Sequence, residues 1–287
     1  MIDKAVLAAA GLGTRLLPLT KELPKEMLPI FVNNGGGRLT LKPMLQAVYE
    51  QLYSTGFRHF CFVVGREKRA IEDHFTPDMD YLNQLIARNK NDQFLAVKAF
   101  YEIIRDSTIV WMNQPEPKGF GDAVLRSESF VGSDMFLCHA GDTYIGSREN
   151  RHLAVLSELS AEERCAASFV AQRVDDPKGF GIVEGDTLGE GLVKVKRVVE
   201  KPEKPMSNIA IMPMYIFKPI VFKALREIEM GYGGEIQLTD AIQRLIDWKY
   251  DVYAHILDPD DIRLDIGTPE TWWEALSASH SYLKSGH

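Results

Sequence analysis

The sequence predicts one α/β domain, on three observations. The apolar run Ala5–Ala9 is short and uncharged, which is typical of a buried parallel strand. Further apolar runs at 60–64 and 135–140 are each followed directly by a glycine, as expected where a strand gives way to a turn. The 287 residues suffice for one large α/β domain or two small ones, and we expect a single domain over residues 1–287.

The order of the other elements follows from apolar runs, helix-start signals and turn residues. Besides Ala5–Ala9, strands are expected at 28–32, 60–64, 109–113, 135–140, 166–170, 180–184, 192–200, 209–217 and 252–256, which would be the last strand. Helices are expected from Pro43, Gly65, Met79, Glu149 and Pro219, in the segment 235–242, and after Pro269.

Three segments carry more specific expectations. The strands at 180–184 and 192–200 alternate like a hairpin around residues 185–191. A flexible insertion that ends near Pro43 is predicted from Asn33–Arg38, because this segment contains three consecutive glycines. In the final helix, the side chains expected to pack in the core are Trp272, Trp273 and Leu276.

Composition argues against two classes of protein. The 33 basic and 40 acidic residues give a formal charge of −7, whereas general nucleic-acid binding needs a basic face. No segment approaches the roughly 20 apolar residues that span a bilayer, and the N-terminus does not read as a signal peptide. Cys61, Cys138 and Cys165 are odd in number and lie in apolar runs, so we expect core thiols of a cytoplasmic protein rather than disulfides or metal ligands.

The turn after the first strand has the chemistry of an anion site. Gly11 and Gly13 let the backbone approach a ligand that a Cβ would hold off, and successive backbone N–H groups in such a turn can bind an anion. Arg15 adds a planar fork of donors and Lys25 a compact cation, both suited to phosphate. The alternative is a tight turn with two surface cations. A dinucleotide fingerprint is excluded because its third glycine would fall on Leu16, and no P-loop Gly-Lys-Ser/Thr is present.

Two later turns carry candidate ligand groups. Gln114 has an amide that can both donate and accept, which suits the edge of a pyrimidine, and Gly119 leaves room for a flat ring. Asp142 follows the strand at 135–140, at the strand end where open α/β sheets bind ligands, and its carboxylate suits Mg²⁺. The alternatives are a rigid turn at 114–119 and an aspartate that only closes a turn.

The segment 11–29 fits the pattern GxGTRxxPxTxxxPKEMLP. This pattern resembles the signature of the sugar-nucleotide pyrophosphorylases, and its Lys-Glu-Met-Leu-Pro end resembles the bacterial UTP–glucose-1-phosphate uridylyltransferase (UDP-glucose pyrophosphorylase) branch. Runs that resemble the same family follow in the expected order, at 65–75, 114–123, 199–202, 234–240 and 265–269. The resemblance extends from Ala5 to Pro269.

The resemblance implies a Rossmann-like three-layer nucleotide-diphospho-sugar transferase fold, with a mixed, mainly parallel central sheet and a small β-rich sugar-binding section. Residues 1–145 would mainly bind the nucleotide, and residues 146–287 would mainly bind the sugar phosphate and supply the C-terminal helices. It also implies a homo-oligomer, either a dimer or a tetramer.

The family's site residues carry over to matching positions. Backbone at Ala10, Gly11 and Gly13, with Arg15, would hold the β- and γ-phosphates, and Lys25 would bridge the pyrophosphate and α-phosphate. The nucleotide base would be recognised by Glu26, Gln114 and Gly119. Mg²⁺ would be bound by Asp142 and Asp265. The sugar phosphate would be bound by Gly181, Glu200 and Lys201. The catalytic set would be Arg15, Lys25, Asp142 and Lys201.

The implied reaction is Mg²⁺-dependent formation of UDP-glucose and pyrophosphate from UTP and glucose 1-phosphate. A thymidylyltransferase that uses dTTP is an alternative, although that branch carries glutamine at the position of Glu26. A non-catalytic sugar-nucleotide sensor is another, disfavoured because both phosphate cations and both acidic metal ligands are present. The chain departs from the family at the insertion 33–38 and at Asp122, where the family has histidine or glutamine; neither departure is given a role.

Overall fold

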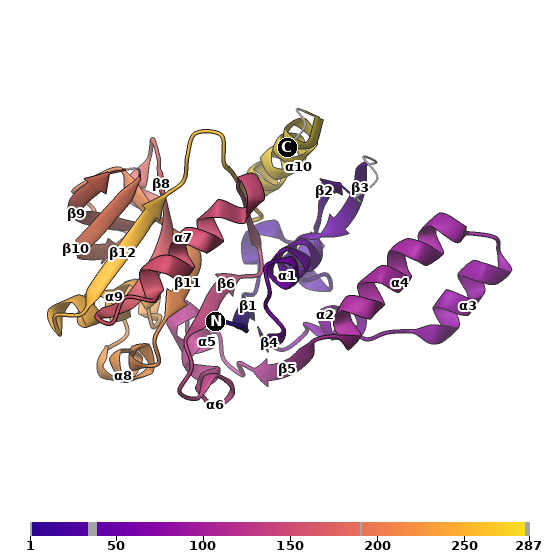
Figure 1. Ribbon diagram of the computed structural model, residues 1–287, viewed down its shortest axis with the longest axis horizontal. Helices are drawn as coiled ribbons and strands as arrows, with labels where there is room; N and C mark the ends of the chain where they lie inside the picture. Colours follow the sequence, from indigo (N-terminus) through magenta and orange to yellow (C-terminus); the bar gives the residue numbers. More distant parts are fainter. Residues whose placement is uncertain (1, 34–38, 190, 285–287) are drawn as a thin grey trace.

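A nine-stranded sheet organises the computed structural model, which describes residues 2–33, 39–189 and 191–284 (Figure 1). Its strands, in spatial order, are β5 (Thr108–Asn113), β4 (His59–Val64), β1 (Lys4–Ala9), β6 (Phe136–Ala140), β11 (Ile209–Phe217), β8 (Cys165–Arg173), β12 (Asp251–Ile256), β10 (Leu192–Glu200) and β9 (Gly181–Gly189). Two smaller sheets pair β2 (Pro29–Asn33) with β3 (Leu39–Pro43) and β7 (Thr143–Gly146) with β13 (Ile262–Asp265).

Helices cover both faces of the large sheet. The helices of the described residues are α1 (Met44–Ser54), α2 (Arg69–His74), α3 (Met79–Ala87), α4 (Asn91–Arg105), α5 (Phe120–Arg126), α6 (Glu128–Val131), α7 (Arg151–Ser160), α8 (Ile220–Glu227), α9 (Leu238–Asp247) and α10 (Pro269–Lys284), of which α10 packs on β2 and β13 and α3 packs on α4. Successive strand residues point to opposite faces, so Val6 packs in the core under α5, α8 and α9, whereas Leu7 packs in the core under α1, α4 and α7. The expected three-layer α/β architecture is confirmed.

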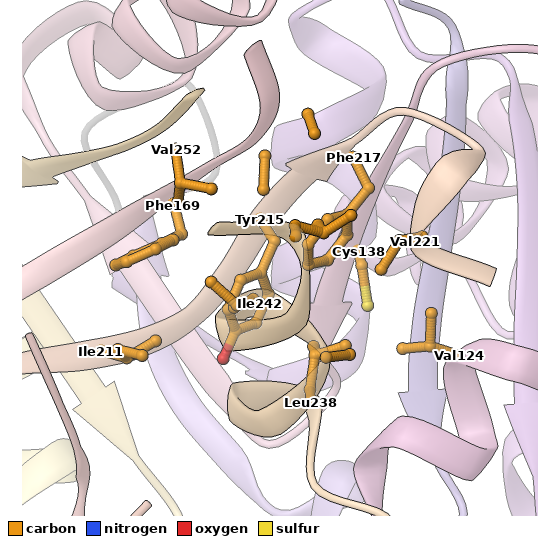
Figure 2. Close-up of a cluster of buried hydrophobic side chains, with 14 of the residues drawn as sticks. Val124, Cys138, Phe169, Ile211, Tyr215, Phe217, Val221, Leu238, Ile242 and Val252 are labelled. Carbon is orange, nitrogen blue, oxygen red and sulfur yellow. The ribbon is translucent and has the colours of Figure 1, made fainter. Parts of the chain in front are cut away.

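One of the two main cores includes the buried face of an amphipathic helix, α9. On α9 the buried positions Leu238, Ala241, Ile242 and Leu245 have the spacing of a single helical stripe. Figure 2 shows Leu238 and Ile242 beside Tyr215 of β11, which lies in the same buried cluster. Because this packing fixes α9 on the sheet, it also fixes the segment that leads into the helix, which lies against the candidate site.

The strand directions place the candidate loops along one edge. β1 is parallel to β4 and β6, and β4 is parallel to β5, while β10 and β11 run against the other strands. The register pairs Ala9 with Val64, Val64 with Asn113, and Ala8 with Ala140. The turns after β1, β5 and β6 therefore leave the sheet at the same edge, the carboxyl edge where α/β sheets bind ligands, with β4 between β5 and β1.

Several element predictions were wrong. Residues 252–256 are not the last strand, because Ile262–Asp265 forms β13 and pairs with β7; these two strands are short, and only the pairing reveals them. The expected turn at 185–191 is mostly strand, since β9 continues to Gly189. Helix α4 was not predicted at all. Figure 1 shows α3 and α4 as a pair that projects from the rest of the molecule, yet Phe94, Val97, Phe100 and Ile104 give α4 an apolar stripe that packs against the core.

Two further predictions concern the tryptophans of the final helix and the insertion at residues 33–38. Trp273 is 69% exposed, whereas Trp272 is partly buried, because adjacent helix positions point about 100° apart and cannot both face the core. Of the insertion 33–38, residues 34–38 lie outside the described residues; the residues that flank them form the β2–β3 pair, with Pro29 opposite Pro43, instead of a loop up to Pro43.

The three cysteines are buried and unpaired with one another, as predicted. Burial raises the pKa of the Cys61 and Cys165 thiols to about 12, so both stay protonated and unreactive at neutral pH. No helix in the described part of the chain is both long and apolar enough to cross a membrane.

Candidate active site

A cleft of about 440 Å³ opens at the carboxyl edge of β1, β5 and β6. It brings together residues that are far apart in the sequence. The sequence-predicted residues that line it are Ala10, Gly11, Gly13, Arg15, Lys25, Glu26, Gln114, Gly119 and Asp142. The remaining four, Gly181, Glu200, Lys201 and Asp265, do not line this volume and are described below.

The loop after β1 is held in place by its own hydrogen bonds. Gly13 has φ +64°, a conformation that favours glycine, and its carbonyl accepts from the Thr20 hydroxyl at 2.8 Å and from the Leu16 amide at 2.9 Å. Leu16 is 4% exposed and packs with Leu28 and Ile30 in a small core. This anchor holds the glycine loop at the cleft, with Gly11 against the Lys25 side chain.

Lys25 and Asp142 form a mostly buried ion pair inside the cleft. Burial alone would lower the pKa of Lys25, but the charges of Asp142 and Glu26 outweigh burial and raise it. Burial alone would raise the pKa of Asp142, but the charge of Lys25 and its hydrogen bond lower it. Lys25 is thus a permanent cation and Asp142 a permanent carboxylate at neutral pH.

Asp265 reaches the same place through the β7–β13 pair. The register sets Asp265 opposite Thr143, the residue after Asp142, and the Ile266 amide donates to the Asp142 carbonyl at 3.0 Å. Burial and the charge of Asp142 raise the pKa of Asp265, as expected for two neighbouring carboxylates. A Cβ on Gly267 would lie 2.8 Å from Asp265 Oδ2 and 3.5 Å from Arg15 Nη2, so this glycine leaves space beside both charged groups.

The two carboxylates fit a magnesium ion that shares substrate oxygens. Within the described ranges, no group of three or more His, Cys, Asp or Glu side chains could hold a metal by itself. Mg²⁺ is commonly held by one or two carboxylates together with substrate phosphates and water. The raised pKa of Asp265 points the same way, because a cation between the two carboxylates would relieve their repulsion.

Gln114 and Gly119 lie in a loop that is hydrogen-bonded to the start of α9. Gly119 has φ +100°, and a Cβ there would lie 2.7 Å from the Glu235 Cβ and 2.9 Å from the Ile236 carbonyl oxygen. The Ile236 amide donates to the Lys118 carbonyl at 2.8 Å, and the Gly121 amide donates to the Ile236 carbonyl at 2.9 Å. The loop is therefore rigid on one side and open to the cleft on the other.

Glu26 has a partner that sequence reasoning missed. It is 1% exposed, and its Oε2 accepts from Lys68 Nζ at 2.9 Å. Burial raises the pKa of Glu26, against the charges of Lys68 and Lys25. Lys68 lies in the segment where a helix was expected from Gly65, but it precedes α2 and is 7% exposed. Nothing in the local sequence distinguishes Lys68 from the charged residues on either side of it, because its burial depends on its contact with Glu26, 42 positions earlier in the chain.

The predicted sugar-binding residues form a second cluster. Gly181 and Glu200 are paired in the β9–β10 ladder, and Lys201 Nζ lies 3.5 Å from Glu200 Oε1 and 4.9 Å from the Tyr232 ring centroid. Thr239, which lies in the segment 235–242 where a helix was expected, donates its hydroxyl to Glu200 Oε2 at 2.7 Å. A Cβ on Gly181 would lie 2.9 Å from the Thr239 hydroxyl, so Gly181 leaves space beside these polar groups.

The fold and the cleft together define a nucleotide-binding α/β protein with a glycine-rich loop after its first strand, a fixed lysine and a pair of acidic residues. The family model described as Nucleotidyl transferase matches residues 4–281. The UTP–glucose-1-phosphate uridylyltransferase of Mycoplasma genitalium is 41% identical over 248 residues, which are 84% of this chain and 80% of the relative. The enzyme of the same name from Bacillus subtilis is 36% identical over 270 residues, covering 93% and 87% of the two chains.

Structural comparison gives the same result. A crystal structure of UDP-glucose pyrophosphorylase complexed with UDP-glucose superimposes with a TM-score of 0.82 and 31% identity, covering 99% of this chain and 100% of that one. The chain belongs to the nucleotidyl transferase family, and within it to the UTP–glucose-1-phosphate uridylyltransferases.

Proposed function

We propose that the protein joins UTP and glucose 1-phosphate to give UDP-glucose and pyrophosphate. The observation that carries the proposal is the ion pair of Lys25 and Asp142 in a cleft that the glycine loop and Gln114 also line, with Asp265 brought beside Asp142 by the β7–β13 pair. The names of the relatives, uridylyltransferases and a pyrophosphorylase bound to UDP-glucose, support these substrates.

In the proposed reaction, an oxygen of the sugar phosphate attacks the α-phosphorus of UTP. The new O–P bond forms as the bond between the α-phosphorus and the bridging oxygen of pyrophosphate breaks, and the electron pair leaves with pyrophosphate. The nucleophile is already an anion, so no general base is needed. Lys25 supports this scheme, because its raised pKa keeps it protonated and suits it to stabilise the charge on the phosphates.

Each remaining residue has a role that fits its position. The glycine loop and Arg15 would bind the terminal phosphates, as backbone N–H groups and a guanidinium do. Gln114, Gly119 and Glu26 would contact uracil, and Glu200 and Lys201 would bind the hexose and its phosphate. Asp142 and Asp265 would hold Mg²⁺, which when bound would neutralise phosphate charge and orient its oxygens. This division would give residues 1–145 mainly the nucleotide and residues 146–287 mainly the sugar phosphate.

We also propose a homo-oligomer in the cytoplasm, where the three buried thiols would stay reduced.

The proposal is tested by measuring pyrophosphate release with UTP, dTTP, ATP, CTP and GTP, each with several sugar 1-phosphates and Mg²⁺. We expect the highest kcat/KM for UTP with glucose 1-phosphate. A thymidylyltransferase would prefer dTTP. No release with any pair, while UTP still bound, would identify a sensor and refute the proposed reaction.

A further inference from the structure

Asp122 is a buried carboxylate next to the cleft that the proposed mechanism does not use. It lies in the first turn of α5 and is 4% exposed. Its Oδ2 accepts from Gln114 Nε2 at 2.8 Å, and its Oδ1 lies 3.3 Å from Nη2 of Arg126, one helical turn further on. Burying a carboxylate is costly unless it is hydrogen-bonded, so these two donors account for its presence at this position.

The same contacts fix the orientation of the Gln114 amide. Its Nε2 donates to the Gly119 carbonyl at 3.1 Å as well as to Asp122. A backbone carbonyl and a carboxylate can only accept, so turning the amide by 180° would place Oε1 against two acceptors. Both N–H groups are therefore engaged within the loop, and Oε1 is the polar atom that Gln114 can offer to the cleft it lines.

An acceptor at this position distinguishes between pyrimidines. Uracil and thymine carry an N–H donor at ring position 3, whereas cytosine carries a lone pair there. A fixed Oε1 would accept from the first two bases and would be repelled by the third. A glutamine free to rotate could meet either kind of edge, because its amide has both a donor and an acceptor end.

We infer that Asp122 is a positioning residue that holds Gln114 as an acceptor and so makes the cleft select uracil-type bases over cytosine. The inference rests on the proposed function, since it assigns base selection to that same cleft. It also gives a role to the position at which the chain departs from the family pattern.

The test compares kcat/KM for UTP, CTP and dTTP in the wild-type enzyme and in Asp122→Asn. Asparagine has nearly the same shape as aspartate, but it has only one acceptor oxygen to share between Gln114 and Arg126. Whichever way the asparagine amide is turned, the Gln114 amide is therefore held less firmly. We expect the UTP-to-CTP ratio to fall about tenfold, which corresponds to 1.4 kcal/mol. The UTP-to-dTTP ratio and the KM for glucose 1-phosphate should stay within twofold, because both bases carry the same N–H and the sugar cluster is untouched.

The matched control is Glu102→Gln, which removes a carboxylate from another pair one helical turn apart, Lys98–Glu102, on the projecting helix α4. It should leave every ratio unchanged. A second variant, Asp122→Glu, keeps a carboxylate but alters the shape, and we expect it to discriminate better than Asp122→Asn. An unchanged UTP-to-CTP ratio in folded Asp122→Asn, or Asp122→Glu discriminating worse than Asp122→Asn, would overturn the inference. If the wild-type enzyme did not use UTP, the proposed function would fail instead.

Discussion

At the scale of single residues, Lys25 has the most strongly determined chemistry in the cleft. It is surrounded by three carboxylates, those of Asp142, Glu26 and Asp265, and all three act to raise its pKa. A lysine in this setting cannot serve as a base near neutral pH. Its contribution must be a fixed positive charge, placed against the loop where the phosphates of a nucleotide would lie.

Replacing Lys25 by alanine should therefore lower the rate of pyrophosphate release by about 10²–10³-fold, the usual effect of losing one group that stabilises charge in a transition state. Circular dichroism would verify that the variant is folded. Lys21→Ala is the control, because Lys21 is on the same segment and its side chain is 77% exposed. Near-normal turnover in Lys25→Ala would remove this lysine from the mechanism.

Asp142 is predicted to act through a metal. In Asp142→Asn we expect the Mg²⁺ concentration that gives half-maximal rate to rise by about tenfold or more, since the loss of groups that support a metal site commonly weakens binding 10–100-fold. A magnesium titration of the steady-state rate measures this shift. Asp134→Asn is the control, because Asp134 pairs with Lys4 at the surface. An identical titration in the two variants would contradict the assignment.

At the scale of elements, the loop between β5 and α5 depends on a contact that only glycine allows. Gly119 approaches the segment before α9 so closely that an added Cβ would lie 2.7 Å from Glu235 Cβ. Gly132, after α6, has φ +65° and nothing within 4 Å of an added Cβ. The two positions therefore separate the effect of backbone conformation from the effect of the close contact.

Gly119→Ala should lower the free energy of unfolding by about 1–3 kcal/mol more than Gly132→Ala does, which is the usual cost of overpacking. It should also raise the KM for UTP about tenfold, because Gln114 and Gly119 share this loop. Urea unfolding and steady-state kinetics measure the two effects. Equal losses of stability in both variants would mean that the neighbouring segment moves away without cost.

Elements with a strong local pattern could be predicted from the sequence, and elements that depend on distant partners could not. The strands β1, β4 and β6 carry continuous apolar runs and were placed to within one or two residues. β7 and β13 are only four residues long and exist because each pairs with the other across more than 100 positions. α4 is an exception, because its apolar stripe at Phe94, Val97, Phe100 and Ile104 was a local signal that the prediction overlooked.

The candidate site shows the same division between residues that a local pattern reveals and residues that depend on distant partners. Nine of the thirteen predicted residues line one cleft, because they belong to motifs that follow the carboxyl ends of parallel strands of one sheet. Lys68 and Thr239 were not assigned a role, since their partners, Glu26 and Glu200, lie 42 and 39 positions away. A buried partner of a predicted charged residue could be sought only once the fold was known.

At the scale of the whole molecule, two buried histidines should make the free energy of unfolding depend on pH. His139 on β6 and His152 on α7 are fully buried, and the Nε2 atoms of both have no hydrogen-bond partner among the described residues. Burial lowers the pKa of His139 to about 4 and that of His152 to about 3. Both rings are therefore neutral in the folded protein at any pH above about 4.

The direction of this pH dependence follows from the number of protons that the folded and unfolded states bind. In the unfolded chain both histidines titrate near pH 6.5, so between about pH 6.5 and pH 4 the unfolded state binds protons that the folded state does not. The stability from these lowered pKa values is complete above the unfolded pKa and is lost as the pH falls. Each histidine contributes up to about 1.4 kcal/mol per pH unit to the slope.

In His152→Asn, the loss of unfolding free energy between pH 7 and pH 4.5 should therefore be smaller than in the wild-type protein by about 2–3 kcal/mol. Asparagine can still accept the Ser147 hydroxyl that bonds to His152 Nδ1 at 2.7 Å, so the local packing is disturbed as little as possible. Urea unfolding at the two pH values gives the difference. His59→Asn, where the side chain is 42% exposed, is the control and should keep the wild-type slope. If His152→Asn also kept that slope, the ring of His152 would have to be protonated in the folded protein, and its burial would not control stability.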